Sequence, residues 1–547
     1  MTELVLGPLL RYVDENAATI WLEASQRCTV TVRCGDQVSE SPTFTVHGHS
    51  YALVDLLGLA PGSSTPYTVE LDGQPVWPPP DSPYPPSRID TLDFGAAELR
   101  IVFGSCRTSV PHDAAGNRSH GIDALRAYAM RMVDEPDRRR PSLLLFLGDQ
   151  VYADETSDAM RDFIAARRDI DEPPGEELKD FQEYAHLYWL AWTDPANRWL
   201  LSTVPSAMIF DDHDIRDDWN TSEAWRQQMA EVPWWHDRIV GGLASYWIYQ
   251  HIGNLSPAER AGDELLAEVR EIGRDGDAGA ALDAFAEAAD ERPEDNRWSY
   301  ARELGTSRLV VLDSRCGRVL RDGERKMLDE SEMAWFEDLA RGDVEHLLIG
   351  TGLPFLLPMG LHHLEAWNEA VAKGTWGRRA GKWGEKIRQG VDLEHWAAFE
   401  NSFQRVGRLV RDLALGRRGK APASVLFLSG DVHNSYLAEA DLGRAAPHGR
   451  LLQAVCSPIR NPLPRIVRFS SAAASYGLAW PMGRLVARSA KVPDPPFSWR
   501  IVQGPWFENS LATIDIDGRQ ARISWEMAEA DEEQRPSMRS VASATIA

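Results

Sequence analysis

The sequence has few cysteines and no long apolar run, and both absences narrow the class of protein. Its 547 residues include only five cysteines, an odd and scattered set that does not fit a disulfide framework. No window approaches the roughly 18 apolar residues of a membrane-spanning helix, and the first residues lack the basic and apolar regions of a signal peptide. We therefore expect a cytoplasmic protein without membrane attachment.

Basic residues are scarce relative to acidic ones. The chain has 58 Lys and Arg against 82 Asp and Glu, which gives a formal net charge of −24. Nucleic acids and anionic membranes are bound by basic surfaces, so neither is an expected partner. An acidic chain that binds an anionic ligand needs local positive charge, and bound metal ions would supply it. No feature of the sequence indicates an oligomeric state.

The chain is long enough for two domains, because one core stops growing at roughly 250–300 residues. Residues 1–75 alternate apolar and polar residues in short runs between turn signals, which is typical of a small antiparallel β-sandwich. The prolines of PVWPPPDSPYPPSR predict a stiff linker over residues 76–90. The large domain is then expected over 91–530 and a flexible polar tail over 531–547. An acidic, alanine-rich stretch near 255–295 has helical spacing and predicts an inserted pair of helices.

Six apolar runs after the linker predict the fold of the large domain. Each is rich in β-forming residues and then breaks into Gly, Asp, Ser or His, as buried strands of an α/β sheet do. We expect an α/β (α+β) sheet core flanked by helices, with the all-β sandwich before it. Ligands bind beyond the carboxyl ends of such strands, so the polar residues that follow should converge. The runs are LRIVFG, LLLFLGD, AMIFDDHD, LVVLDSR, HLLIGTG and VLFLSGDVH.

Three of these strand ends are crowded with titratable groups. Asp149 follows the second run, and Asp431 and His433, two residues apart, follow the last. The DDHD sequence around Asp212 places four titratable groups side by side, which would repel one another unless they are solvated or bind cations. Each motif alone has an ordinary alternative, a cap or a solvated loop. Three together predict a shared cation site.

Cys106 occupies the matching position after the first run. A buried free cysteine is usually inert packing. The strand-end position and the neighbouring Arg107 instead favour a thiolate ligand.

The motifs GSC, GDxxYAD, DDHD, LDSR and SGDVH, in this order, resemble those of the alkaline phosphatase D family, the PhoD-like metallophosphoesterases. The resemblance covers nearly the whole chain, since that family also carries a fibronectin- or immunoglobulin-like sandwich before its catalytic domain. DDHD departs from the commoner DDHE at Asp214. The resemblance implies that Asp149 bridges the metals, that Asp212, Asp431 and His433 bind them, that His213 faces the phosphate, and that Cys106 and Tyr152 bind Fe³⁺, with Ca²⁺ completing the cluster.

The chemistry of the donors agrees with these metals. Thiolate and phenolate suit a transition metal, whereas a surplus of carboxylates suits Ca²⁺. Zn²⁺, Mn²⁺ and Mg²⁺ remain alternatives.

Substrate contacts are expected from three further residues. Arg315 in LDSRCGR is the expected clamp on a phosphate oxygen and, with His213, a catalytic group. Arg107 is expected at the substrate, and Asp313 either orients Arg315 or contacts metal, an ordinary buried ion pair being its alternative. The basic, Trp-rich KGTWGRRAGKWGEK predicts a lid or rim, or else packing at the domain edge.

The expected activity is hydrolysis of small-molecule phosphate monoesters or diesters by a metal-bound hydroxide. Two alternatives are a metal-dependent hydrolase of another bond, such as a lactone or amide, and a non-catalytic recognition protein on a degenerate scaffold.

Overall fold

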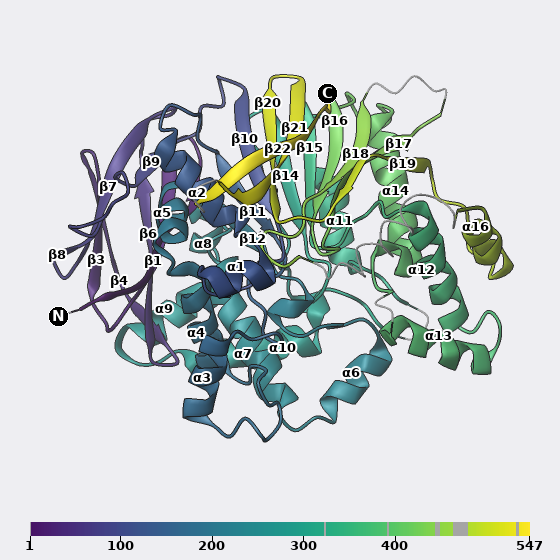
Figure 1. The fold of residues 1–547 in the computed structure, drawn as a ribbon, viewed down its shortest axis with the longest axis horizontal. Helices are drawn as coiled ribbons and strands as arrows, with labels where there is room; N and C mark the ends of the chain where they lie inside the picture. Colours follow the sequence, from purple (N-terminus) through teal and green to yellow (C-terminus); the bar gives the residue numbers. More distant parts are fainter. Residues whose placement is uncertain (1, 322–323, 391–392, 444–448, 463–479, 532–534) are drawn as a thin grey trace.

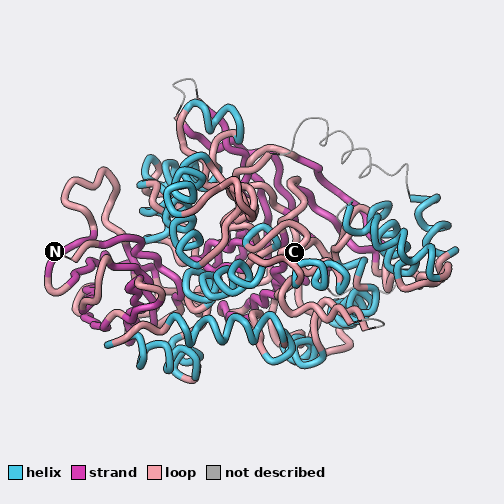
Figure 2. Tube along the Cα trace, turned by 90° about the horizontal axis from the view of Figure 1, so that it is seen from below, coloured by secondary structure: helices cyan, strands magenta, loops and turns pink. Residues whose placement is uncertain are grey.

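The computed structural model describes residues 2–321, 324–390, 393–443, 449–462, 480–531 and 535–547. Strands of the N-terminal region lie at one end of the molecule, and a larger mixed α/β body occupies the rest (Figure 1). Seen from a perpendicular direction, helices surround the strands of this body (Figure 2). No helix within the described ranges is both long and apolar enough to cross a membrane.

The N-terminal region consists of two small sheets with apolar residues buried between them. The strand orders are β1-β2-β6-β5 and β4-β3-β7-β8, and every pairing is antiparallel. Their shared core includes Ile20, Val32, Val54 and Val69, which are all fully buried. The strands are β1 (Leu4–Val13), β2 (Ala17–Ala24), β3 (Thr29–Cys34), β4 (Gln37–Pro42), β5 (Phe44–Val46), β6 (His49–Leu57), β7 (Ser64–Leu71) and β8 (Gln74–Trp77).

The proline-rich segment is not a free linker over its whole length. Strand β8 ends inside it, at Trp77, and β9 (Arg88–Asp90) pairs with β7. Prolines exclude the segment from a sheet interior but leave its two ends free to pair at an edge.

All six apolar runs of the body form strands, as predicted, but they are divided between two sheets. The first has the order β12-β11-β10-β20-β21-β22 and the second β13-β14-β15-β16-β18-β17-β19. Strands β10, β11 and β12 are parallel, as are β14, β15, β16 and β18. Bounds are β10 (Glu98–Gly104), β11 (Leu143–Leu147), β12 (Ser206–Ile209), β13 (Tyr300–Leu304), β14 (Ser307–Leu312), β15 (His346–Thr351), β16 (Ser424–Ser429), β17 (Ser435–Asp441), β18 (Arg450–Val455), β19 (Ser498–Trp506), β20 (Ser510–Asp517), β21 (Gln520–Ala530) and β22 (Pro536–Thr545).

The C-terminal segment is part of the first sheet. A flexible tail over 531–547 was the wrong expectation, because β22 pairs along its length with β21. Ile546 beyond it is fully buried, and its backbone N–H donates to Ala521 O at 2.8 Å. Small polar residues give no apolar pattern, yet their backbones pair at a sheet edge as well as any others.

The acidic stretch near 255–295 forms helices, as its spacing predicted. Helices α9 (Glu264–Asp275) and α10 (Gly279–Glu291) lie in it, and the backbone N–H of Ala278 donates to Thr45 O in β5 at 2.8 Å. Arg11 of β1 is fully buried, and its guanidinium donates to the carbonyls of Tyr249 and Gln250, each at 2.6 Å. The N-terminal sheets are therefore packed firmly onto the body.

Helices cover the outer faces of the two large sheets. Helix α2 packs against β20, β21 and β22, and α14 packs against β16 and β18. The helices, besides α9 and α10, are α1 (Ala114–His120), α2 (Ala124–Asp134), α3 (Asp158–Arg167), α4 (Phe181–Trp192), α5 (Pro195–Thr203), α6 (Glu223–Ala230), α7 (Trp235–Tyr246), α8 (Pro257–Ala261), α11 (Glu330–Leu339), α12 (Met359–Ala372), α13 (Arg378–Gly390), α14 (Glu400–Ala414) and α16 (Trp480–Ser489).

Candidate metal centre

Polar residues from both large sheets meet at the carboxyl ends of their strands. Cys106 and Asp149 follow β10 and β11 of the first sheet, and Asp431 and His433 follow β16 of the second. All four have left-handed backbones, with φ of 58°, 50°, 64° and 48°. Such φ values are uncommon outside glycine and cost on the order of 1–3 kcal/mol each, so they persist where function requires them.

Glycine before two of these aspartates lets the strand ends approach each other. A Cβ on Gly148, whose φ is 100°, would lie 2.6 Å from Asp211 Cβ. A Cβ on Gly430 would lie 1.9 Å from Ser105 Oγ. Both contacts are impossible for a larger residue, which explains why each motif begins with Gly-Asp.

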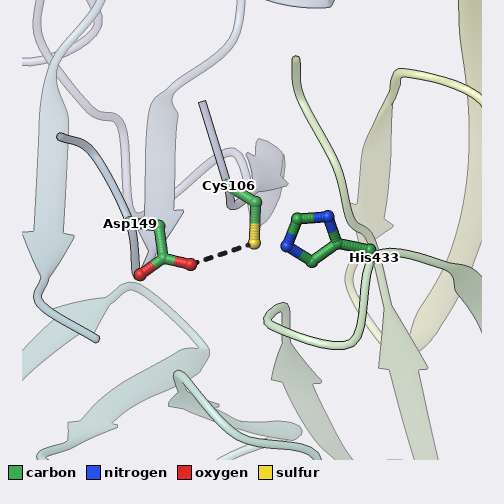
Figure 3. Close-up of side chains that lie close together, drawn as sticks. All are labelled: Cys106, Asp149 and His433. Atoms are coloured by element: carbon green, nitrogen blue, oxygen red, sulfur yellow. Dashed lines mark hydrogen bonds between the residues drawn. The ribbon is translucent and has the colours of Figure 1, made fainter. Parts of the chain in front are cut away.

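The first group of possible metal ligands is Cys106, Asp149 and His433, whose ligand atoms all lie within 4.8 Å of one another. The Cys106 thiol donates to Asp149 Oδ2 at 3.3 Å, and the His433 ring faces the sulfur (Figure 3). His433 Nδ1 lies 2.7 Å from the carbonyl of Asn461, so Nε2 is the ring nitrogen whose lone pair is left to bind a metal. The Tyr152 hydroxyl lies 3.4 Å from Asp149 Oδ2.

The second group is Asp149, Asp212 and Asp431, again within 4.8 Å. Asp149 therefore belongs to both groups, as a bridging carboxylate must. Its Oδ1 is buried and accepts no hydrogen bond from any described residue. A buried carboxylate oxygen without a partner is costly, and a cation satisfies it. These donors fit two neighbouring ions.

Without bound metal, burial disfavours the deprotonated, anionic forms of these ligands. It raises the pKa of the Cys106 thiol to about 11, with the charge of Asp431 adding to the effect. Burial likewise raises the pKa of Asp149 well above its usual value and that of Asp212 to about 6. Bound cations favour the deprotonated forms, so metal binding and ligand ionisation are coupled.

His213 is held beside the two groups by a carboxylate. Its Nδ1 lies 2.9 Å from Asp154 Oδ1, and its ring is 4.7 Å from that of Tyr152. Burial lowers the pKa of His213, but the charge of Asp154 and that of Asp212 outweigh it and raise that pKa well above its usual value. The residue is therefore positioned as a proton-bearing imidazole.

Asp214 organises the backbone under the site. Its Oδ2 accepts from the backbone N–H of Asp149 and that of Asp211, each at 2.9 Å, and Gln250 donates to its Oδ1 at 3.0 Å. Aspartate in place of the commoner glutamate thus has a positioning task in this chain.

Arg315, the expected clamp on a phosphate oxygen, lies beside the second group. The side chain is fully buried and forms ion pairs with Asp211 and Glu394. Its Nη2 lies 3.1 Å from Asp212 Oδ1 and 3.6 Å from Asp431 Oδ1. The guanidinium offsets the repulsion among these carboxylates.

The other two expected substrate residues are not brought to these groups. The Arg107 guanidinium binds Asp123 at 2.8 Å and donates to the carbonyl of Ala191 at 2.7 Å. The Asp313 carboxylate accepts from the backbone N–H groups of Arg315, at 2.7 Å, and of Gly317, at 2.7 Å. Arg107 anchors helices, and Asp313 holds the turn that presents Arg315.

Two residues at the site had no strand-end signal. His395 Nε2 lies 3.2 Å from Asp431 Oδ2, and its Nδ1 lies 2.8 Å from Glu365 Oε1. Glu394 binds Arg315 and also Arg318, at 2.9 Å. Both precede a short helical turn and follow no strand. The only sequence signal for them is that a glutamate and a histidine are adjacent.

The fold and this cluster define the metallophosphoesterase class. The model of the PhoD-like phosphatase family matches residues 120–464, and the chain belongs to this family. Residues 1–89 match a domain of unknown function, DUF7800.

A solved structure described as "Structure of PhoD" shows the same fold. It has a TM-score of 0.61 and 12% identity, and the match covers 99% of this chain and 90% of that one. The purple acid phosphatase PPD1 from yellow lupin (Lupinus luteus) seeds matches with a TM-score of 0.49 and 10% identity over 99% and 74% of the chains. No curated protein matches.

Proposed function

We propose that the protein is a metal-dependent phosphatase or phosphodiesterase in which Asp149 would contribute its carboxylate to both metal-ligand groups. The observation that carries this function is Asp149 itself. It belongs to both ligand groups, and one buried carboxylate oxygen has no partner among the described residues. Family membership supports phosphoesterase chemistry at this place.

The donor types suggest which ion each group would hold. Cys106, Tyr152, Asp149 and His433 offer thiolate, phenolate, carboxylate and imidazole, a set suited to Fe³⁺. Asp149, Asp212 and Asp431 offer only oxygen, as Ca²⁺ prefers. Zn²⁺, Mn²⁺ or Mg²⁺ would fit the second group as well.

Bound metals would supply positive charge to the phosphoryl oxygens and would acidify a water molecule. The chain itself supplies a proton at His213, whose Nδ1 is fixed by Asp154, so that Nε2 can donate to a leaving oxygen. Arg315 supplies fixed positive charge beside Asp212 and Asp431. Its neighbours hold it rigidly, which suits transition-state stabilisation.

We place an immunoglobulin- or fibronectin-like domain at residues 1–75 and a catalytic domain that begins at residue 91 and includes β22, because β22 belongs to its first sheet. The two N-terminal sheets and the match over residues 1–89 support this division. We expect the protein to act in the cytoplasm on a small-molecule phosphoester.

The experiment compares an aryl phosphate, a bis-aryl phosphate and the corresponding aryl acetate as substrates. We expect hydrolysis of one or both phosphoesters, its loss after metal chelation and its recovery on adding metal back. Matched turnover of the acetate would favour a hydrolase of another bond. Phosphoester turnover that survives complete chelation would contradict the metal-dependent mechanism, and inactivity toward all three would favour the binding protein.

A further inference from the structure

A hollow lies between the first turn of α6, the segment before α11, and helices α12 and α13. Its volume is about 570 Å³, and it shares no lining residue with either metal-ligand group. Among the described residues, the carboxylates of Glu223 and Glu385 line it. The cationic side chains of the described residues that line it are Arg321, Arg325, Lys373, Arg378, Lys382 and Arg388.

The inner wall of this cavity carries more positive than negative charge. Glu369 is only 1% exposed, and three cations share it. Arg388 Nη2 lies 2.6 Å from its carboxylate, Lys373 Nζ 2.7 Å and Arg325 Nε 3.1 Å. One carboxylate cannot neutralise three cations, and Glu385, which pairs with Arg388 at 2.9 Å, offsets one more. This excess is unusual in a chain whose net charge is −24.

Arg325 is a buried cation with an unused hydrogen-bond donor. The side chain is 5% exposed, and its Cζ lies 4.3 Å from the Phe399 ring centroid. Nη1 donates to the carbonyl of Thr221 at 3.0 Å, whereas Nη2 is buried without a hydrogen-bond partner among the described residues. Burial, together with the charge of Arg388, lowers the pKa of Arg325 to about 9, which an anion in the cavity would reverse.

The cavity is separate from the metal centre but lies next to its supporting residues. Arg318 bonds the carbonyl of Asn220 at 3.1 Å and Glu394 at 2.9 Å, and Glu394 pairs with Arg315. Arg325 binds the following carbonyl, that of Thr221. Arg325 of the cavity and Arg318, which binds Glu394, therefore contact neighbouring carbonyls of the same segment.

We propose that this cavity is a second anion site, which binds a phosphate group independently of the metal centre. The planar guanidinium of Arg325, which lines the cavity, matches the geometry of a phosphate group, and the exposed Lys382 and Arg378 would attract the dianion. All the positive charge comes from side chains, so no metal is required. The ligand class is a small molecule with a phosphate group, or inorganic phosphate itself.

The test is calorimetric titration of inorganic phosphate into the full chain carrying Asp149→Asn, which removes the contribution expected from the metal centre. We expect one binding site per chain to remain. The exposed double variant Arg378→Ala/Lys382→Ala should weaken it at least ~10-fold, and Arg325→Gln should do the same, because bonds to charged groups are the strong ones.

The matched control is Arg379→Ala/Lys386→Ala, which removes two exposed cations of α13 that do not line the cavity. It should change the affinity less than ~2-fold, as expected for solvated surface charges. Equal weakening by both double variants would show diffuse charge attraction and contradict the site, as would unchanged affinity in the cavity variants or no binding in the Asp149→Asn chain.

The same titration on the chain without Asp149→Asn distinguishes this proposal from the proposed function. Two phosphate sites are expected there. If only one phosphate site is found and the cavity variants abolish it, the cavity proposal is supported and phosphate binding at the metal centre is contradicted. Should Arg325→Gln fail to fold, the exposed double variant still decides the question.

Discussion

Two buried charged clusters lie beyond the carboxyl ends of β10 and β11, one around Asp123 and one around Asp149, and their contacts differ completely. Asp123 accepts from Arg107 Nη2 at 2.8 Å, from Arg107 Nε at 3.1 Å and from the backbone of Leu125 at 2.9 Å. Asp149 has an oxygen without a partner among the described residues, and its backbone is left-handed. Burial of charge alone therefore does not mark a functional site, whereas an unsatisfied carboxylate oxygen on a strained backbone points to one.

Replacing aspartate by asparagine should mainly reduce turnover at one cluster and mainly reduce stability at the other. Asp149→Asn should lower phosphoester turnover on the order of 10⁴-fold, because it touches both ions and even a change behind a single ligand costs roughly 10–100-fold. In metal-free protein it should leave the melting temperature near or above that of the metal-free parent chain, since a repelled buried carboxylate is lost. Steady-state kinetics and calorimetry check both expectations. Normal turnover would remove Asp149 from the site.

Asp123→Asn should instead cost about 3–5 kcal/mol of unfolding free energy, because it breaks a buried ion pair, with little change in the turnover of folded protein. The charge of Arg107 lowers the pKa of Asp123 despite the opposing effect of burial. A depressed folded pKa stabilises the protein above the unfolded pKa of about 4, and that contribution disappears as the pH falls toward the folded pKa. The stability difference between the two chains, from urea unfolding, should therefore shrink below about pH 4. A large loss of turnover with stability intact would reverse the assignment.

The variant Cys106→Ser tests whether Cys106 binds metal, in contrast to the other buried cysteines. If Cys106 and Tyr152 bind Fe³⁺, the purified protein should be coloured, and Cys106→Ser should shift the absorption and weaken metal binding about 10–100-fold. Tyr152→Phe should also alter the spectrum. Cys456→Ser is the control, because Cys456 is buried but belongs to no ligand group within the described residues. Identical spectra and metal contents in the Cys106 and Cys456 variants would show that Cys106 is a core packing residue and not a metal ligand.

Asp313→Asn should have the smallest effect. The amide can still accept some of the backbone hydrogen bonds that hold the Arg315 turn, so we expect a loss of about tenfold or less in kcat/KM. A drop as large as that of Asp149→Asn would show that Asp313 contacts metal or substrate directly.

The sequence predicted the features that depend on local pattern. Each buried strand and the polar residue after it are neighbours in the chain, so Asp149, Asp431 and Cys106 could be identified as candidate site residues before any fold was known. The division of the strands into two sheets depends on long-range pairing and could not. Nor does sequence show where a long side chain points, which is why Arg107 was assigned to the substrate when it binds Asp123.

His395 was missed for a related reason. It reaches Asp431 from a loop that follows no strand, so its position depends on tertiary packing. The C-terminal strand was missed because edge pairing needs no apolar alternation.

The most direct test of the Asp149-centred metal site is the metal content of protein purified without chelators, measured by mass spectrometry on samples whose phosphoester hydrolysis is also assayed. The account predicts about two ions per chain, iron among them, and a marked fall of both metal and activity in Asp149→Asn. Full hydrolytic activity in protein with almost no bound metal would contradict it.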